Sequence, residues 1–294
     1  MTDAIPRTHA NLLAGIAPDV ETGNLPGIGR DNTQEKSEIA DFMKMIERMG
    51  GTDASLSGMH LEAMAAGVEQ FMVATAGADW REIGLPISIA ALHEVGEALV
   101  HTRNLWCWWS RTPEPVDSGE VVIELFDTSL HLLAMVLQQV PVTEMVASMH
   151  PDHVVTKLVN IFNATWNRHF DVMQEEGIPQ SHEGAVLVSY LDELSHCIIS
   201  RNPVEAFGVL GAAMAIIGMN PNILCAGLMG KLHLARFRDE NGYRTGEYRK
   251  VWSGGQEDNR FLLHLLTESA TTGFALMLGS YDDIKPLFEI AYSA

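Results

Sequence analysis

The chain has 294 residues and a formal net charge of −19. This length is enough to bury a hydrophobic core in one large domain or two small ones. The acidity argues against nucleic acid or an anionic membrane as a partner, because both carry negative charge. The three cysteines, Cys107, Cys197 and Cys225, form no CxxC pair, which argues against a disulfide framework or a zinc site and favours a reducing, cytoplasmic location.

The first part of the chain, residues 1–35, is rich in Gly, Pro, Asn and Asp and shows no periodicity. We therefore expect a poorly ordered arm there, and it lacks the apolar core of a signal peptide. Residues 36–294 are expected to form a single all-α domain, because apolar residues recur at helical spacing and period-two alternation is nearly absent. The longest apolar run, 207–219, is too short to span a bilayer.

Helical patterns follow one another along the expected domain. The first begins at Lys36 and ends at Gly50, and the next is capped by Ser55 or Ser57 and ends at Gly77. Later helices are expected over residues 83–104, 120–140, 143–174 with an interruption at Pro151, 185–201, 204–218, 222–238, 259–276 and 282–291.

Two pairs of carboxylates stand out on these helices. Glu94 and Glu97 lie three residues apart, as do Glu124 and Asp127, and on a helix this spacing places each pair on one face. Apolar residues surround both pairs, where an ionised carboxylate needs a compensating partner because its desolvation is costly. No Lys or Arg lies within one turn of either pair, so we predict a bound divalent cation, Mg²⁺ first. The alternative is that each pair marks the solvated stripe of an amphipathic helix.

A basic, Gly-rich segment lies near the C-terminus. Its cations and hydroxyl donors are Lys231, Arg238, Tyr243, Arg244, Tyr248, Arg249 and Lys250. Such groups bind phosphate oxygens, so the segment is expected to hold a polyphosphate, although a solvated loop would have the same composition. The residues that follow, 257–259, are interpreted first as a helix cap with Asp258 as the N-cap.

Three tryptophans, Trp106, Trp108 and Trp109, lie between the two acidic helices. They predict either a buried hinge or a stacking wall beside a base or sugar.

The order of these motifs resembles the dimeric, all-α dUTPase family, which is related to other all-α nucleoside triphosphate pyrophosphatases. The resemblance runs from about Glu62 to about Leu263. The matching motifs are Gly77-x-x-Trp80, Glu94-x-x-Glu97, Trp106-x-Trp108-Trp109, Glu124-x-x-Asp127 and, most specifically, the block from Gly230 to Trp252 followed by Glu257-Asp258-Asn259.

This resemblance implies a homodimeric enzyme that hydrolyses a deoxynucleoside triphosphate to the monophosphate and pyrophosphate. The metal ligands implied are Glu94, Glu97, Glu124 and Asp127, which would hold two Mg²⁺ ions with substrate bound, or Mn²⁺ in their place. Glu97, more than Glu94, would orient or deprotonate the attacking water. The residues implied to contact phosphate are Lys231, Arg238, Tyr243 and Lys250.

The resemblance also implies two structural parts. A rigid part would comprise residues 36–142 and 202–294, and a mobile helical region, 143–201, would close over the nucleotide.

The base-recognition positions depart from the family pattern. Uracil-specific members carry a Gln and an Asn ahead of the Gly-x-x-Trp, and Val68 and Met72 stand there in this chain. With Trp80 and Trp106 they would line the base and sugar pocket, and the loss of amides predicts an altered base preference. Two alternatives stay open: a genuine dUTPase whose base contacts come from backbone groups or from Glu69-Gln70, and a nucleotide-binding regulator without turnover.

Overall fold

The structure is a computed structural model, and it describes residues 55–107, 117–145, 152–176, 180–252, 255–268 and 279–293. The arm expected at 1–35 and the helix expected from Lys36 lie outside these residues. The described part of the chain is mostly helical and holds no strand, only an isolated antiparallel bridge between Val251 and Glu257. The prediction of the all-α class is therefore confirmed for the described residues.

The helices follow the order expected from the sequence. They are α3 (Gly58–Ala76), α4 (Ile87–His101), α5 (Arg103–Trp106), α6 (Ser118–Leu137), the 3₁₀ turn η1 (Val142–Glu144), α7 (Val154–Glu176), α8 (Gln180–Ile199), α9 (Pro203–Ile216), α10 (Pro221–Glu240), α11 (Asp258–Glu268) and α13 (Tyr281–Ser293).

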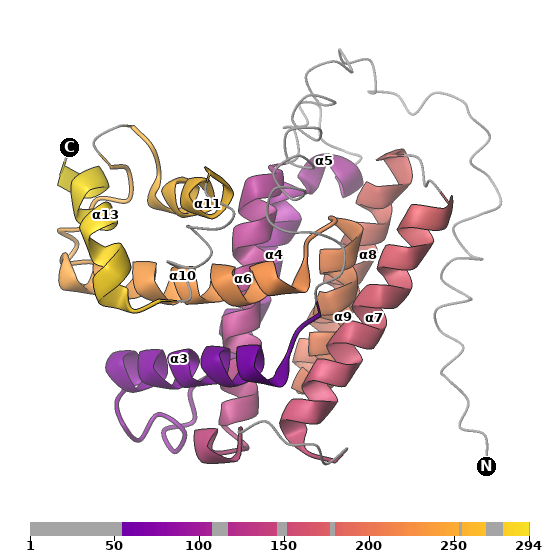
Figure 1. Cartoon of the computed structure of the whole chain (residues 1–294), viewed down its shortest axis with the longest axis horizontal. Coiled ribbons are helices and arrows are strands. Elements are labelled where there is room, and N and C mark those ends of the chain that lie inside the picture. Colours follow the sequence, from indigo (N-terminus) through magenta and orange to yellow (C-terminus); the bar gives the residue numbers. More distant parts are fainter. Residues whose placement is uncertain are drawn as a thin grey trace.

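The helices pack in two directions, as Figure 1 shows. α4, α6, α7, α8 and α9 run steeply beside one another, with α4 against α6 and with α7 and α8 against α9. α3 and α10 cross this group and contact both α6 and each other, while α11 and α13 pack on α10. Within the steep group, α6 is therefore the acidic helix that contacts the crossing helices, and α4 packs against α6 and α8.

The helix α9 is apolar on all sides, which is typical of a helix that is buried all round. Nearly all of its residues, from Ala206 to Ile216, are buried beneath α6, α7 and α8. The indole Nε1 of Trp166 donates to the Met219 carbonyl oxygen over 2.8 Å and so satisfies a buried polar group beside this helix.

One hydrophobic core joins these helices, from Leu56 before α3 to Phe288 in α13. The region expected to be mobile, 143–201, contributes α7 and α8 to the same core through residues such as Phe162 and Leu191. Its closure over a nucleotide stays a prediction.

Local chemistry explains the helix boundaries. Of the two candidate caps for α3, Ser57 is the one used, because its side chain accepts from the His60 N–H and Nδ1 of His60 accepts from the Ser57 N–H. The helix predicted over 83–104 is two helices in the structure. α4 begins after Pro86 and ends at His101, and α5 begins after Thr102.

No single helix in the described part of the chain is long and apolar enough to cross a membrane. The bent pair α9 and α10, at 107°, passes a test of length and composition when the two are taken together.

Candidate metal centre

Two helices, α4 and α6, bring the acidic pairs together. The end of α4 lies beside the start of α6, since the Asp117 N–H donates to the His101 carbonyl oxygen over 3.2 Å. The Asp117 side chain caps α6 by accepting from the Glu120 N–H, also over 3.2 Å. The helices are therefore antiparallel, so residues late in α4 face residues early in α6.

Three of the four predicted metal ligands converge. Glu94 on α4 and both Glu124 and Asp127 on α6 each offer a carboxylate oxygen, and these oxygens lie within 4.8 Å of one another. Glu124 is the most deeply placed of the three, with 6% of its surface exposed. An oxygen-only donor set of this kind suits a hard divalent cation such as Mg²⁺.

The fourth predicted ligand, Glu97, is not part of this group. Its side chain is 46% exposed, and its Oε1 lies 3.6 Å from Nε2 of His93 on the outer side of α4. Its charge still raises the pKa of Glu124. Glu97 thus faces solvent beside the cluster, where a water molecule could reach it.

The electrostatics of the cluster separate two of its carboxylates. Burial, followed by the negative charge of Asp127, raises the pKa of Glu124 to about 9. Burial would also raise the pKa of Glu94, but a hydrogen bond and the charge of His131, with a hydrogen bond from Glu124, lower it below its usual value. Without a cation, Glu124 therefore holds a proton at neutral pH.

The nearest cation to the cluster comes from α10. Nζ of Lys231 lies 2.7 Å from Oδ2 of Asp127 and also donates to Oδ1 of Asn259 over 2.9 Å. The Lys231 side chain is only 5% exposed. The predicted phosphate-binding residue therefore contacts a predicted metal ligand directly, and it neutralises part of the charge of the cluster.

Arg238 lies two turns further along α10 and is also paired within the chain. Its guanidinium forms two hydrogen bonds with Asp258, at 2.8 and 2.7 Å, and a third with Oδ1 of Asn259 at 3.0 Å. The hydroxyl of Tyr248 donates to the same Asp258 carboxylate over 2.7 Å. Asp258 is the first residue of α11 instead of its cap, and its side chain ties three segments together.

The other two predicted phosphate-binding residues are exposed. Tyr243 and Lys250 follow α10 in a turn that uses Gly242 and Gly246 at positive φ. The guanidinium carbon of Arg238 lies 6.0 Å from the centre of the Tyr243 ring. Both exposed side chains are open to a ligand in this structure.

The predicted base-pocket residues are part of the core. Val68 and Trp80 are fully buried and Met72 nearly so, which leaves none of these side chains open to a base in this structure. The Trp106 indole donates to the Leu99 carbonyl oxygen over 2.8 Å. Trp108 and Trp109 lie outside the described residues.

The alternative base reader, Glu69, is engaged by its neighbours. Nη1 of Arg81 donates to Oε1 of Glu69 over 2.8 Å, Nη2 pairs with Oε2, and the Trp80 indole is 3.4 Å from Oε1. Arg81 Nε also donates to the Leu137 carbonyl oxygen, so this ion pair fixes the turn after α3 against the end of α6.

The sequence did not indicate three residues of the site. They are His131, Asn259 and Asp258, whose carboxylate accepts hydrogen bonds from both Arg238 and Tyr248. His131 lies one turn after Asp127 on α6, so the helical spacing carried a signal for it. Asp258 and Asn259 meet α10 only in the folded chain.

Comparison of the chain with models of protein families finds no match, and comparison with curated proteins finds none either. The case for a function therefore rests on the residues of the site.

Proposed function

We propose that the chain is a Mg²⁺-dependent hydrolase that converts a deoxynucleoside triphosphate to the monophosphate and pyrophosphate. One observation carries the proposal: three carboxylates, from Glu94, Glu124 and Asp127, meet within 4.8 Å at the buried face between two helices. Maintaining such a cluster costs stability unless a cation compensates it. The resemblance of the motif order to the dimeric all-α dUTPase family supports the same reaction.

The residues of this chain fit a metal-assisted hydrolysis. Glu94, Glu124 and Asp127 would hold the ion, which when bound supplies positive charge to phosphate oxygens. Lys231 holds the Asp127 carboxylate in place by its ion pair. Glu97 is accessible and lies on the same helix as Glu94, so it is the candidate to accept a proton from the attacking water.

Phosphate binding is assigned to the segment after α10. Tyr243 and Lys250 are exposed and would contact the phosphates directly. Lys231 and Arg238 are held by Asp127, Asp258 and Asn259. Their positive charge would therefore act on the phosphates without direct contact, unless these pairs open when substrate binds. No covalent intermediate is needed, since positioning and electrostatic stabilisation suffice for phosphoryl chemistry.

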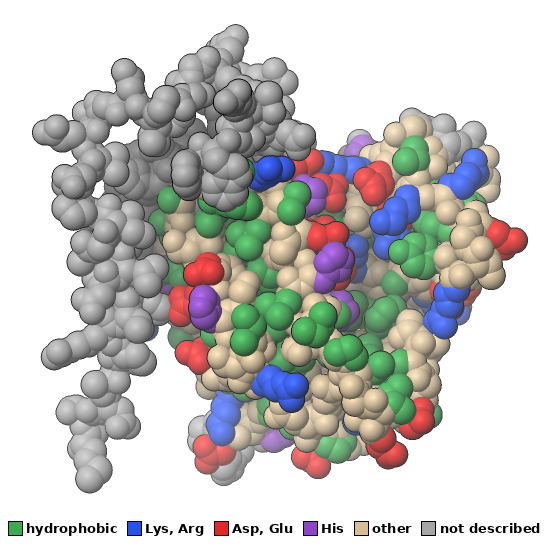
Figure 2. All heavy atoms as spheres, turned by 180° about the vertical axis from the view of Figure 1, so that it is seen from behind, with side chains coloured by type: hydrophobic (Ala, Val, Ile, Leu, Met, Phe, Trp, Pro, Cys, Tyr) green, Lys and Arg blue, Asp and Glu red, His purple; other side chains and the backbone are tan. Residues whose placement is uncertain are grey.

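A homodimer is part of the proposal. Large apolar side chains are exposed on the outer face of α4, at Ile89 and Val100, which are 62% and 61% exposed. Figure 2 shows groups of hydrophobic side chains on one face of the molecule, with histidine, acidic and basic side chains among them. Light scattering on the wild type and on Ile89→Lys tests whether two copies pair through the outer face of α4. A monomeric wild type would contradict the dimer.

Release of pyrophosphate is the direct test of the reaction. We would assay a panel of deoxynucleoside and ribonucleoside triphosphates with Mg²⁺ or Mn²⁺, using wild type, Glu97→Ala and Glu124→Gln. The matched control is Glu82→Gln, an exposed carboxylate in the turn between α3 and α4. The proposal expects turnover that both site variants lose and the control keeps.

Each outcome of the assay discriminates among the alternatives. A folded wild type that turns over no nucleotide would overturn the hydrolase, and retained nucleotide affinity in that case would favour a regulator. Preference for dUTP would favour a genuine dUTPase with other base contacts. Preference for another base would agree with the absence of the amide side chains that uracil-specific members of the family carry.

A further inference from the structure

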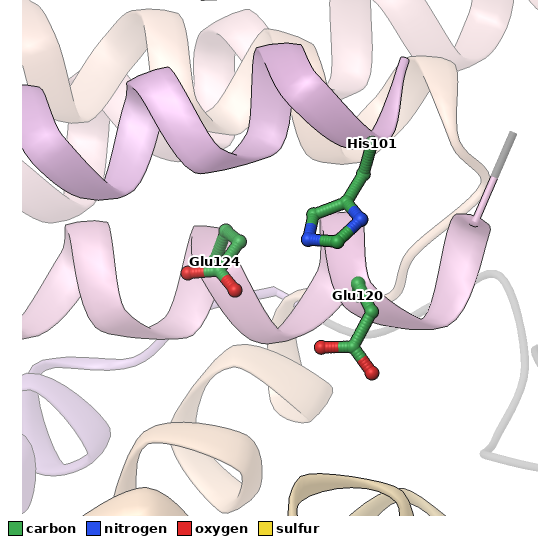
Figure 3. Close-up of side chains that lie close together, drawn as sticks. All are labelled: His101, Glu120 and Glu124. Carbon is green, nitrogen blue, oxygen red and sulfur yellow. The ribbon is translucent and has the colours of Figure 1, made fainter. Parts of the chain in front are cut away.

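A second group of metal-ligating side chains lies one turn away from the first. His101 ends α4, and it faces Glu120 and Glu124 on the first turns of α6, as Figure 3 shows. One ligand atom from each of the three lies within 4.8 Å of the other two. Glu124 belongs to both groups, so the two sets of ligands would share one carboxylate.

Both carboxylates of this second group are deeply buried. Glu120 is 9% and Glu124 is 6% exposed. Oε1 of Glu120 is shielded from solvent and has no hydrogen bond among the described residues, although Nε of Arg260 lies 2.8 Å from it as an ion pair. Arg260 is shared with Asp117, with which its Nη2 also pairs. One guanidinium therefore serves two carboxylates, and Glu124 has no ion pair in the described part of the chain.

The imidazole of His101 adds a nitrogen donor to these oxygens. It has no hydrogen bond or ion pair with any residue that the structure describes, yet it points into the space between α4 and α6 in Figure 3. The backbone on both sides is fixed, because the His101 carbonyl oxygen accepts from the Asp117 N–H. The three ligands therefore lie where the end of α4 meets the start of α6.

Helix dipoles explain part of this arrangement. A histidine in the last turn of α4 and a glutamate in the first turn of α6 are both favourable by that effect. The dipoles do not require the two side chains to face each other, nor do they compensate the buried Glu124 further along α6.

We propose that His101, Glu120 and Glu124 form a second divalent-cation site, selective for a transition ion of the Zn²⁺, Co²⁺ or Mn²⁺ type, with Glu124 bridging it to the first site. Metal–ligand bonds of about 2.1 Å place two ligand atoms on one ion about 3 to 4.2 Å apart, so small side-chain rotations would complete the site. Imidazole favours borderline ions over Mg²⁺, whereas the oxygen-only group of Glu94, Glu124 and Asp127 suits Mg²⁺. The two sites together would therefore hold one Mg²⁺ ion and one transition-metal ion.

Binding of Co²⁺ without nucleotide tests this inference. Equilibrium dialysis of the full chain is expected to give two Co²⁺ ions per chain, and excess Mg²⁺ should displace one of them. His101→Ala and Glu120→Gln should lose the ion that resists Mg²⁺ and keep the other. Asp127→Asn should show the reverse, which makes it the matched control for the first site.

The outcomes separate this inference from the proposed hydrolase, with which it shares Glu124. A wild type that holds no Mg²⁺-resistant Co²⁺ would overturn the second site, whatever its activity with Mg²⁺. His131 is the competing imidazole, since its Nε2 lies 3.6 Å from Oε1 of Glu94. If His131→Ala, and not His101→Ala, removed the resistant ion, the assignment to His101 would be wrong. Far-ultraviolet circular dichroism confirms that each variant is folded.

Discussion

The ammonium group of Lys231 lies 2.7 Å from the carboxylate of Asp127, and this ion pair joins α10 to the acidic face of α6. The two residues are far apart in the sequence, and the lysine is almost fully buried. The pair places one positive charge beside a cluster of carboxylates. Its removal should therefore reveal how much of the repulsion in the cluster the lysine compensates.

Lys231→Met should destabilise the metal-free protein. Breaking a buried ion pair costs about 3–5 kcal/mol, and the partial exposure of Asp127 predicts a value at the lower end. Mg²⁺ should stabilise this variant more than the wild type, because the ion replaces the missing charge. Urea unfolding with and without Mg²⁺ measures both effects. The control is Lys285→Met, which removes an exposed pair with Glu240 and should change the stability little.

Glu124→Gln should stabilise the metal-free protein while it weakens cation binding. The pKa of Glu124 is about 9 in the folded chain against 4.5 ordinarily, so between these values the folded chain holds a proton that the unfolded chain releases. The free energy of unfolding of the wild type therefore falls as the pH rises through this range. The glutamine has no such proton, so at pH 8 the variant should be more stable than the wild type by about 1–3 kcal/mol, which is less than full linkage gives because solvent screens the group.

Urea unfolding in EDTA at pH 5 and pH 8 checks this sign. The gain of Glu124→Gln should be larger at pH 8 than at pH 5, and the exposed Glu82→Gln should change little at either pH. An equal loss of stability at both pH values would show that the Glu124 carboxylate makes favourable contacts in the apo protein, against this prediction.

Asp258→Asn should loosen the C-terminal helices. The Asp258 carboxylate accepts two hydrogen bonds from Arg238 and one from Tyr248, and its side chain is fully buried. The variant leaves a buried guanidinium without its counter-charge, at a cost of about 3–5 kcal/mol. Hydrogen exchange should accelerate in α11. Asp239→Asn, which breaks an exposed arginine pair, serves as the control and should change stability by less than about 1 kcal/mol.

Local signals in the sequence predicted much of the fold. Ser57 and Gly77 fixed the bounds of α3 through a capping box and a C-cap glycine. The three-residue spacing of Glu124 and Asp127 predicted that both carboxylates lie on one face of α6, and in the structure both lie in the group with Glu94. In each case the information lies within one or two helical turns, which is the range over which helix geometry acts.

The rest depends on how helices meet. Spacing places Glu94 and Glu97 on one face, but it does not say where on that face the partner helix lies, and α6 contacts the side of Glu94 while Glu97 stays half exposed. The pairing of Lys231 with Asp127 requires α10 to cross α6 at one particular level, meaning one position along the axis of α6. That level is set by packing between distant segments, which no local pattern encodes.

The level of that crossing is set in part by Gly227, and Gly227→Ala should disrupt it. A Cβ at Gly227 would lie 2.1 Å from Cζ of Phe126, so α10 could no longer approach α6 beside Glu124 and Asp127. Overpacking of this kind costs about 1–3 kcal/mol. Gly96→Ala is the matched control, because a Cβ there has no neighbour within 4 Å and should stabilise α4 by about 0.5–1 kcal/mol. Thermal unfolding of both variants measures the difference, and Phe126→Leu should rescue Gly227→Ala. A Gly227→Ala protein as stable as Gly96→Ala would contradict the close approach of the two helices.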